Sequence, residues 1–194
     1  MTKNVYICRL KMSVGMKALK EFTIPFVGLK EGEHNFEFEI DNTFFRNFEF
    51  EEFNESCVKA SLKLLKKSTL LELYFNADGL VNINCDLTNE PYNQSINDDF
   101  KLVVKFGAEY NDDNEEILIL PHGEYELNVA QYIYELIILA VPAKRVHPGV
   151  EDGTLKSDVL SKLEELSPNG DNTEKSSEDI DPRWNNLKKL LTDK

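Results

Sequence analysis

The sequence contains few residues whose types and spacing could support catalysis or metal binding. Its three histidines stand far apart, and none lies four residues from another, so the H-E-x-x-H zinc helix is excluded. The nine glycines form neither a G-x-G-x-x-G fingerprint nor a P-loop, and a G-x-S-x-G nucleophile motif is absent. We therefore predict no metal and no cofactor, and we expect that the protein is not an enzyme.

The segment Cys85-Asp86-Leu87-Thr88 comes nearest to a metal-binding motif. A C-x-x-C knuckle would indicate zinc or redox chemistry, but the second position here is Thr88, which is a poor zinc ligand. The chain has three cysteines and no C-x-x-C, so a disulfide framework is not expected. We interpret Cys85 as a half-buried structural residue of a protein in a reducing cytoplasm.

Glu135 is the one acidic residue in the middle of an otherwise apolar segment. A carboxylate that loses its water there would have a raised pKa unless a cation pairs with it. Lys144 and Arg145 follow shortly after Pro142, so we predict a structural ion pair between Glu135 and Arg145. The alternative is a hydrolase that uses Glu135, although no second catalytic group accompanies it in the sequence.

Glu135 belongs to a predicted helix, Asn128–Val141, that is apolar almost all round. Asn128 can act as its N-cap, and Pro142 ends it. A helix of this kind must be enclosed by protein or by lipid. It is too short to span a bilayer, and no segment of the chain reaches eighteen consecutive apolar residues, so no membrane span is predicted. The rest of the chain must therefore surround this helix.

Strands joined by short turns precede the helix. The segment His34–Ile40 alternates phenylalanine with glutamate, which is typical of a half-buried strand. Alternating or apolar runs predict the other strands, and Asn76–Asp78 is predicted to bend or bulge. These are 22–27, 57–65, 69–75, 79–85, 100–106 and 116–120, with a short helix at 43–53. The predicted fold is α+β: a curled, largely antiparallel sheet or partial barrel of about six to seven strands packed on one buried helix, followed by a helical tail.

The two ends differ in composition from the predicted core, residues 21–148. Residues 1–20 hold five basic side chains and no acidic one, and we expect a flexible basic leader there. After the core we predict an accessory helix within 149–166 and a disordered linker over 167–180. A final helix, 181–194, carries a stripe formed by Trp184, Leu187, Leu190 and Leu191.

The charge balance restricts the classes of partner. The 194 residues carry a net charge of −13, and the estimated pI is about 4.7. A uniformly acidic surface repels phosphate backbones, so general nucleic-acid binding is disfavoured. Basic partners such as ribosomal proteins are favoured.

Several motifs together resemble the YceD family, the large ribosomal RNA subunit accumulation proteins, in the form found in Bacteroidetes-type bacteria. They are the loop C-D-x-T-x-E-P-[YF] at 85–92, the segment Ile117–Glu135, IILAVP at 137–142, the pair His147-Pro148, and DPRWNNLKKL at 181–190. The resemblance extends from about residue 22 to residue 191. It implies a bacterial cytoplasmic protein needed for large-subunit ribosomal RNA to accumulate. It brings no catalytic residues, and the zinc site of relatives with C-x-x-C is not expected here.

The candidate partner-binding residues fall into three groups. They are Cys85, Asp86 and Glu90 in the loop, Lys144, Arg145 and His147 after the helix, and Trp184, Leu187 and Lys188 in the tail. We predict that the protein binds a basic ribosomal protein or a pre-ribosomal particle, with the Trp184 helix as an anchor. The rival hypothesis is direct binding of large-subunit ribosomal RNA by the basic N-terminus, Lys144, Arg145 and the Lys188-Lys189 pair. No small-molecule substrate and no membrane contact are expected.

Overall fold

The computed structural model describes residues 19–114 and 116–166, which form two units, one ending at Thr154 and one beginning at Leu155. Most of the predicted leader, the predicted linker 167–180 and the predicted helix 181–194 lie outside the described residues. The candidate residues Trp184, Leu187 and Lys188 lie outside them as well.

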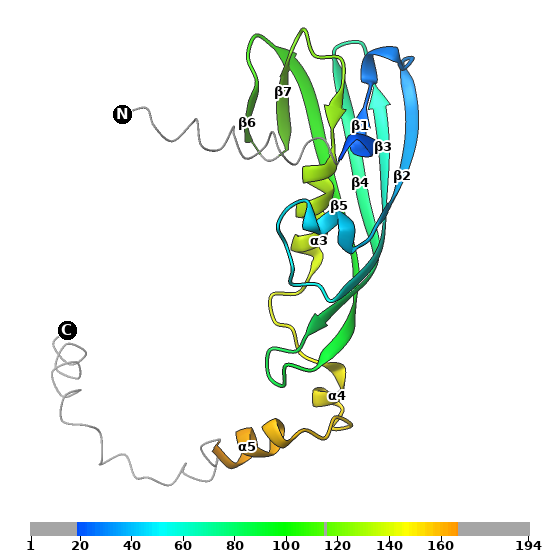
Figure 1. Ribbon diagram of the computed structural model, residues 1–194. Helices are drawn as coiled ribbons and strands as arrows, with labels where there is room; N and C mark the ends of the chain where they lie inside the picture. Colours follow the sequence, from blue (N-terminus) through cyan, green and yellow to red (C-terminus); the bar gives the residue numbers. More distant parts are fainter. Residues whose placement is uncertain (1–18, 115, 167–194) are drawn as a thin grey trace, which may run out of the picture. The chain divides into compact units, whose positions relative to one another are not determined.

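A six-stranded sheet forms the body of the first unit (Figure 1). Its order is β2-β3-β4-β5-β7-β6, and every pair is antiparallel except β5 and β7, which run parallel. The strands are β2 Gly32–Ile40, β3 Glu55–Lys66, β4 Leu70–Asn84, β5 Pro91–Gly107, β6 Asn111–Asn114 and β7 Ile117–Pro121. A separate two-stranded sheet pairs β1, Thr23–Ile24, with β8, Leu127–Asn128.

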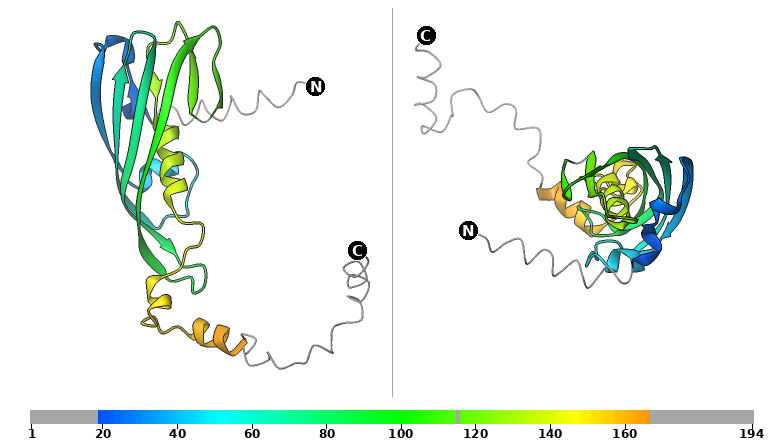
Figure 2. Two further views of the ribbon diagram at one scale, coloured as in Figure 1. Left: turned by 180° about the vertical axis from the view of Figure 1, so that it is seen from behind. Right: turned by 90° about the horizontal axis from the view of Figure 1, so that it is seen from above.

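The sheet curls around helix α3, Ala130–Ala140, as the view from above in Figure 2 shows. It stays open, because β2 and β6 are its two edges and do not pair with each other. The predicted α+β fold, with a curled and mainly antiparallel sheet around a buried helix, is confirmed. Short elements complete the described chain: the 3-10 turns Lys20–Phe22 and Phe26–Gly28, and the helices α2 Asn42–Arg46, α4 Pro148–Glu151 and α5 Asp158–Leu166.

The core lies between the concave face of the sheet and α3. Alternate residues of each strand point to opposite faces, so one set of side chains from β3, β4 and β5 is buried against the helix. Ile133 and Ile137 of α3 have no exposed surface. The same buried core includes inward strand residues of β3, β4 and β5: Leu62, Leu64, Leu73, Phe75, Leu102 and Val104.

The outward face of α3 differs from the prediction of a fully enclosed helix. Gln131 and Glu135 are exposed, and Leu139 keeps 79% of its surface exposed. Asn128 lies just before the helix, and its side-chain oxygen accepts from the Ala130 amide at 3.0 Å. Its side-chain nitrogen donates to the Leu19 carbonyl at 3.0 Å, which ties the start of the described chain to the start of α3.

Several predicted elements have different boundaries in the structure, among them the predicted strand 100–106, which is the second part of the longer strand β5. The expected helix 43–53 is limited to α2, which Asp41 caps by accepting from the Thr43 and Phe44 amides. The rest of that segment is a loop in which Phe48 and Phe50 pack on Tyr134 of α3; Phe48 stacks on that ring at 4.3 Å. The expected strand 22–27 is reduced to β1 between two 3-10 turns. Finally, 69–75 and 79–85 are parts of one continuous strand, β4.

Candidate functional site

The structure brings together two of the three predicted groups of site residues. The loop between β4 and β5 meets the segment that follows α3, and their backbones are joined at Asp86 and Arg145. The Asp86 amide donates to the Arg145 carbonyl at 2.7 Å, and the Arg145 amide donates to the Asp86 carboxylate at 2.8 Å. We call this junction of residues 85–90 with 145–147 the clasp. It fixes the tip of the β4–β5 hairpin to the end of the core helix.

Cys85 is the buried centre of the clasp. Only 2% of its surface is exposed, and its sulfur accepts from the His147 amide at 3.3 Å. Its own amide donates to the Glu90 carbonyl at 2.9 Å, and its carbonyl accepts from the Asn89 amide at 2.8 Å. These bonds close the 85–90 loop into a compact turn around the thiol, in which Asn89 adopts a left-handed backbone.

The environment of Cys85 favours its thiolate. Burial acts to raise the pKa of the Cys85 thiol, but this effect is outweighed by a hydrogen bond from the Thr88 hydroxyl and by backbone amides, including that of His147. The pKa of Cys85 therefore lies below its ordinary value. Thr88, which stands where a C-x-x-C motif has its second cysteine, is itself buried and serves the sulfur as a hydrogen-bond donor.

The side chain of His147 makes two contacts, besides the bond from its amide to Cys85. Its Nδ1 accepts from the Gly149 amide at 2.9 Å, which begins helix α4 with Pro148 in its first turn. Its ring packs edge-on against Tyr92 of β5, with 5.5 Å between the ring centroids. These contacts fix the position of the His147 ring within the clasp.

The predicted ion pair between Glu135 and Arg145 is wrong. Arg145 Nη1 pairs with Glu52 Oε2 at 2.8 Å, while Glu135 accepts from Gln131 Nε2 at 2.8 Å on the exposed face of α3. The helix turns Glu135 toward solvent, and the chain after Pro142 carries Arg145 to the loop after α2. Both partners of the observed pair are partly exposed, so it contributes about 0–1 kcal/mol to stability.

The loop of the clasp is partly exposed. Asp86 is exposed, Leu87 has 41% of its surface exposed at the hairpin tip, and Glu90 is half-buried. Lys144, next to the clasp, is exposed as well. No group of three or more His, Cys, Asp or Glu side chains with a metal-binding arrangement occurs within 19–114 and 116–166. The clasp therefore offers a surface for contact and, in this part of the chain, no such metal-ligand set.

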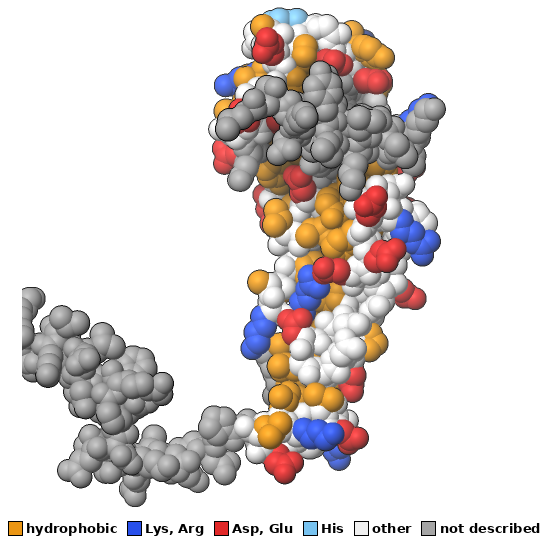
Figure 3. Space-filling model, turned by 60° about the vertical axis from the view of Figure 1, so that its left-hand side comes forward, with side chains coloured by type: hydrophobic (Ala, Val, Ile, Leu, Met, Phe, Trp, Pro, Cys, Tyr) orange, Lys and Arg blue, Asp and Glu red, His pale blue; other side chains and the backbone are white. Residues whose placement is uncertain are grey.

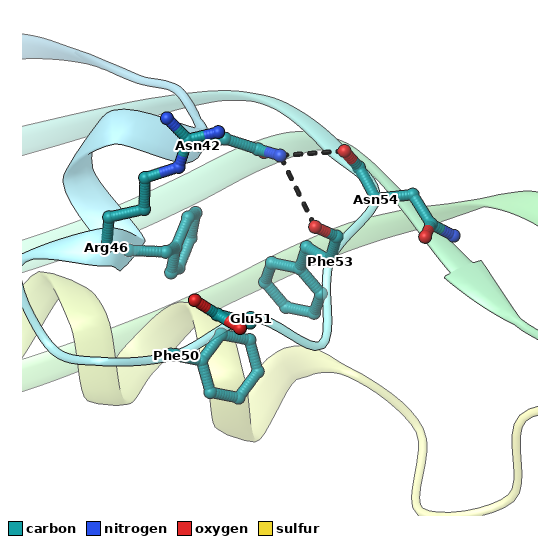
Figure 4. A pocket seen from close by; sticks show the side chains of 7 residues that line it. Asn42, Arg46, Phe50, Glu51, Phe53 and Asn54 are labelled. Atoms are coloured by element: carbon teal, nitrogen blue, oxygen red, sulfur yellow. Dashed lines mark hydrogen bonds between the residues drawn. The ribbon is translucent and has the colours of Figure 1, made fainter.

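A pocket that the sequence did not predict is lined by α2 and by the loop that follows it (Figure 4). The same loop carries Glu52, the partner of Arg145 of the clasp. Its volume is about 200 Å³. Asn42 shapes one wall by donating to the Phe53 and Asn54 carbonyls at 3.3 Å and 2.7 Å. Opposite charges, Arg46 and Glu51, line it together with phenylalanine rings. The residues that line it are Asn42, Phe45, Arg46, Phe50, Glu51, Phe53 and Asn54. The run of phenylalanines was the only sequence signal for it.

The lowered pKa of Cys85 predicts a pH-dependent contribution to stability. A thiol whose pKa is lower in the folded chain binds fewer protons there than in the unfolded chain, so stability rises with pH up to the unfolded pKa of about 8.5. The same contribution is lost as the pH falls through the folded pKa. We expect the stability lost in Cys85→Ser to be larger at pH about 8.5 than at pH about 6.

The measurement is urea denaturation of both proteins at the two pH values. Cys57→Ser, which alters an exposed cysteine, is the matched control, and its difference from the unaltered protein should stay constant. A Cys85→Ser difference that does not grow with pH would show that the hydrogen bonds around the sulfur do not favour its thiolate.

Comparison with known proteins identifies the family. No curated protein and no solved structure matches the chain. The family model described as large ribosomal RNA subunit accumulation protein YceD matches residues 73–191, which is more than half of the 194 residues. The matched span starts in β4 and includes β5, α3 and every residue of the clasp. The chain belongs to the YceD family.

Proposed function

We propose that this protein supports the accumulation of large-subunit ribosomal RNA by binding a basic ribosomal protein or a pre-ribosomal particle, without catalysing a reaction. The family description supplies the process, and the charge of the folded core supports the class of partner. Residues 19–154 contain 11 Lys and Arg against 26 Asp and Glu, a net charge of −15. This concentration of charge is the observation that carries the proposal, because it attracts cationic proteins and repels nucleic-acid backbones.

The acidic residues are spread over several elements. Figure 3 shows acidic side chains distributed along one face around a strip of hydrophobic ones. Exposed examples occur on the edge strand β2, on β5, on β6 and in the turn before β8. They are Glu33, Glu37, Glu39, Asp98, Asp99, Asp112, Asp113, Glu124 and Glu126. A field of this kind increases the association rate of a basic partner and is weakened by salt.

Several basic residues of the described chain are engaged within it, which weighs against direct RNA binding. Arg145 is paired with Glu52, Lys63 with Glu33 at 2.8 Å, and Lys67 with Glu72 at 3.0 Å. Lys66 donates to the carbonyls of Phe26 and Leu29, both at 2.8 Å. Lys144 remains exposed next to the clasp. Lys20 of the N-terminal group is also described and exposed. The other cations of the RNA-binding hypothesis lie outside the described residues.

The hydrolase hypothesis depended on a desolvated Glu135. The structure instead exposes this residue, with Gln131 as its hydrogen-bond partner, and the pocket at α2 is lined by other residues.

The described helices also bear on the membrane prediction: none of them combines the length and the apolar character that a membrane crossing requires.

Affinity purification of the tagged full-length protein from its own cells tests the proposal. We expect basic large-subunit ribosomal proteins to co-purify, to remain after RNase treatment, and to be released by salt, because the attraction is electrostatic. Loss of all ribosomal proteins on RNase treatment would favour direct RNA binding instead. Recovery of no ribosomal component in either arm would overturn the proposal.

A further inference from the structure

β2 is a long and regular edge strand. Its nine residues pair with β3 without interruption, from Gly32 opposite Lys66 to Ile40 opposite Val58. It contains no proline and no bulge, and it ends the strand order of the sheet. Half of its backbone N–H and C=O groups point away from β3, and no backbone hydrogen bond from another described segment satisfies them. An edge of this length is a template for an added strand.

The two faces of β2 have different chemistry. The outward side chains are exposed and mostly acidic: Glu33, Asn35, Glu37 and Glu39. The inward side chains of His34, Phe36 and Phe38 are only half-buried, whereas Leu62 and Leu64 at inward positions of the neighbouring β3 are 1% exposed. Phe38 stacks on Phe22 with 5.0 Å between the ring centroids, but the concave face stays partly exposed along this edge. Side chains of a further strand would lie beside these rings.

We propose that the outer edge of β2 binds an extended segment of a basic protein as an additional strand of the sheet. This inference rests on the proposed function and specifies how the partner is recognised. Side chains alternate along a strand, so one set of partner residues would lie beside Glu37 and Glu39, and the other beside Phe36 and Phe38. The fitting segment alternates Lys or Arg with apolar residues. Its backbone provides affinity, and the alternation provides specificity.

A second copy of the chain fits this edge poorly. Pairing β2 with another β2 would bring rows of glutamates together, and like charges on neighbouring strands destabilise a sheet. The same acidic row that prevents self-association attracts a strand that carries lysine or arginine. Charge complementarity thus selects a basic partner over self-pairing.

The test uses the full-length protein and a fluorescent nine-residue peptide in which lysine alternates with valine. We expect saturable binding by anisotropy, and protection of β2 amides from hydrogen exchange when the peptide is present. A peptide of the same composition with its lysines grouped at one end should bind much more weakly. The alternating peptide should also fail to bind when a central lysine and the neighbouring valine are both N-methylated. Successive amides point to opposite edges of a strand, so one of the two methyl groups blocks pairing with β2 whichever edge the peptide presents.

Charge reversal on the protein separates this edge from the rest of the acidic surface. Glu37→Lys with Glu39→Lys should weaken binding of the alternating peptide about tenfold. Glu124→Lys with Glu126→Lys makes the same change in net charge at exposed positions before β8 and is expected to have a small effect. Equal weakening by both pairs would show general electrostatic attraction and would overturn the proposal.

Two further outcomes are distinguishable. If ribosomal proteins co-purify with the Glu37→Lys, Glu39→Lys variant as well as with the unaltered protein, the proposed function stands and the β2 edge is wrong. Residues 1–18 carry four basic and no acidic side chains. If the peptide binds only after these residues are deleted, the edge belongs to the chain's own N-terminal segment. That result would also overturn the proposal of a separate partner.

Discussion

Replacing Ile137 with alanine is expected to lower the free energy of unfolding by about 3 kcal/mol, within the range of about 2–5 kcal/mol for such truncations in a core. Ile137 lies on the inward face of α3 and has no exposed surface. Removing three of its carbon atoms discards apolar burial and leaves a cavity between the helix and the curled sheet, which packing closes only in part. Equilibrium urea denaturation measures the loss.

Leu139→Ala is the matched control because it removes three carbon atoms from the same helix at a position that is 79% exposed. We expect a change within about 0.5 kcal/mol, since alanine suits a helix and little burial is lost. An equal loss for Leu139→Ala would show that something covers the outer face of α3 in solution. The pair of variants therefore reports which side of the helix the fold depends on.

The sequence predicted the layers of the fold because periodicity records which face of an element is buried. The alternation of His34–Ile40 identified β2 and its acidic outer face, and the three-to-four spacing around Ile133 and Ile137 identified the core of α3. The cap that Asp41 forms on α2 is local in the same way, because it joins Asp41 to residues two and three positions later. These features depend on residues close together in the chain.

The clasp was predicted only in part, because its contacts join residues far apart in the sequence. The candidate residues were chosen from motifs, and the structure shows that Asp86 reaches Arg145 across 59 positions. The partner of Arg145 was missed: Glu52 stands 93 positions earlier, in a loop that was expected to be helix. Glu135 is nearer to Arg145 in the sequence than Glu52 is. It does not pair with Arg145, because its side chain points outward from the helix.

The continuity of β4 was another failure of local reasoning. Asn76 and Asp78 are turn-forming residues, and the segment Asn76–Asp78 was predicted to bend or bulge. In the structure Asn76 and Asp78 point outward and are exposed, and Asn97 of β5 donates to the Asp78 carboxylate at 3.0 Å. Pairing on both sides by β3 and β5 holds the strand through this segment, because strand propensity is weak compared with sheet context.

Gly79→Ala is expected to destabilise the protein by about 3 kcal/mol, because the position has no room for a side chain. Gly79 is opposite Val58, and a Cβ atom placed on it would lie 2.3 Å from the Cys57 carbonyl oxygen and 2.6 Å from the Val58 Cα. Both obstacles are backbone atoms of β3, so no side-chain rotation relieves the clash. Glycine is therefore required by the close approach of the two strands where the sheet curls, and its backbone conformation is an ordinary one.

The measurement is the thermal midpoint, which should fall by roughly 10 °C for a loss of this size in a domain of this length. Gly123→Ala is the control: a Cβ there meets nothing within 4 Å, and we expect a change within about 0.5 kcal/mol of zero.

Gly79→Ala is studied together with a second, core-stabilising substitution if the single variant is too unstable to purify. Hydrogen exchange on this double variant would show which strands lose protection. Loss of protection confined to β3 and β4 supports the steric cause, because the clash separates those two strands first. Unchanged stability would mean that β3 can move away from β4, and the curl of the sheet around α3 would then not depend on this contact.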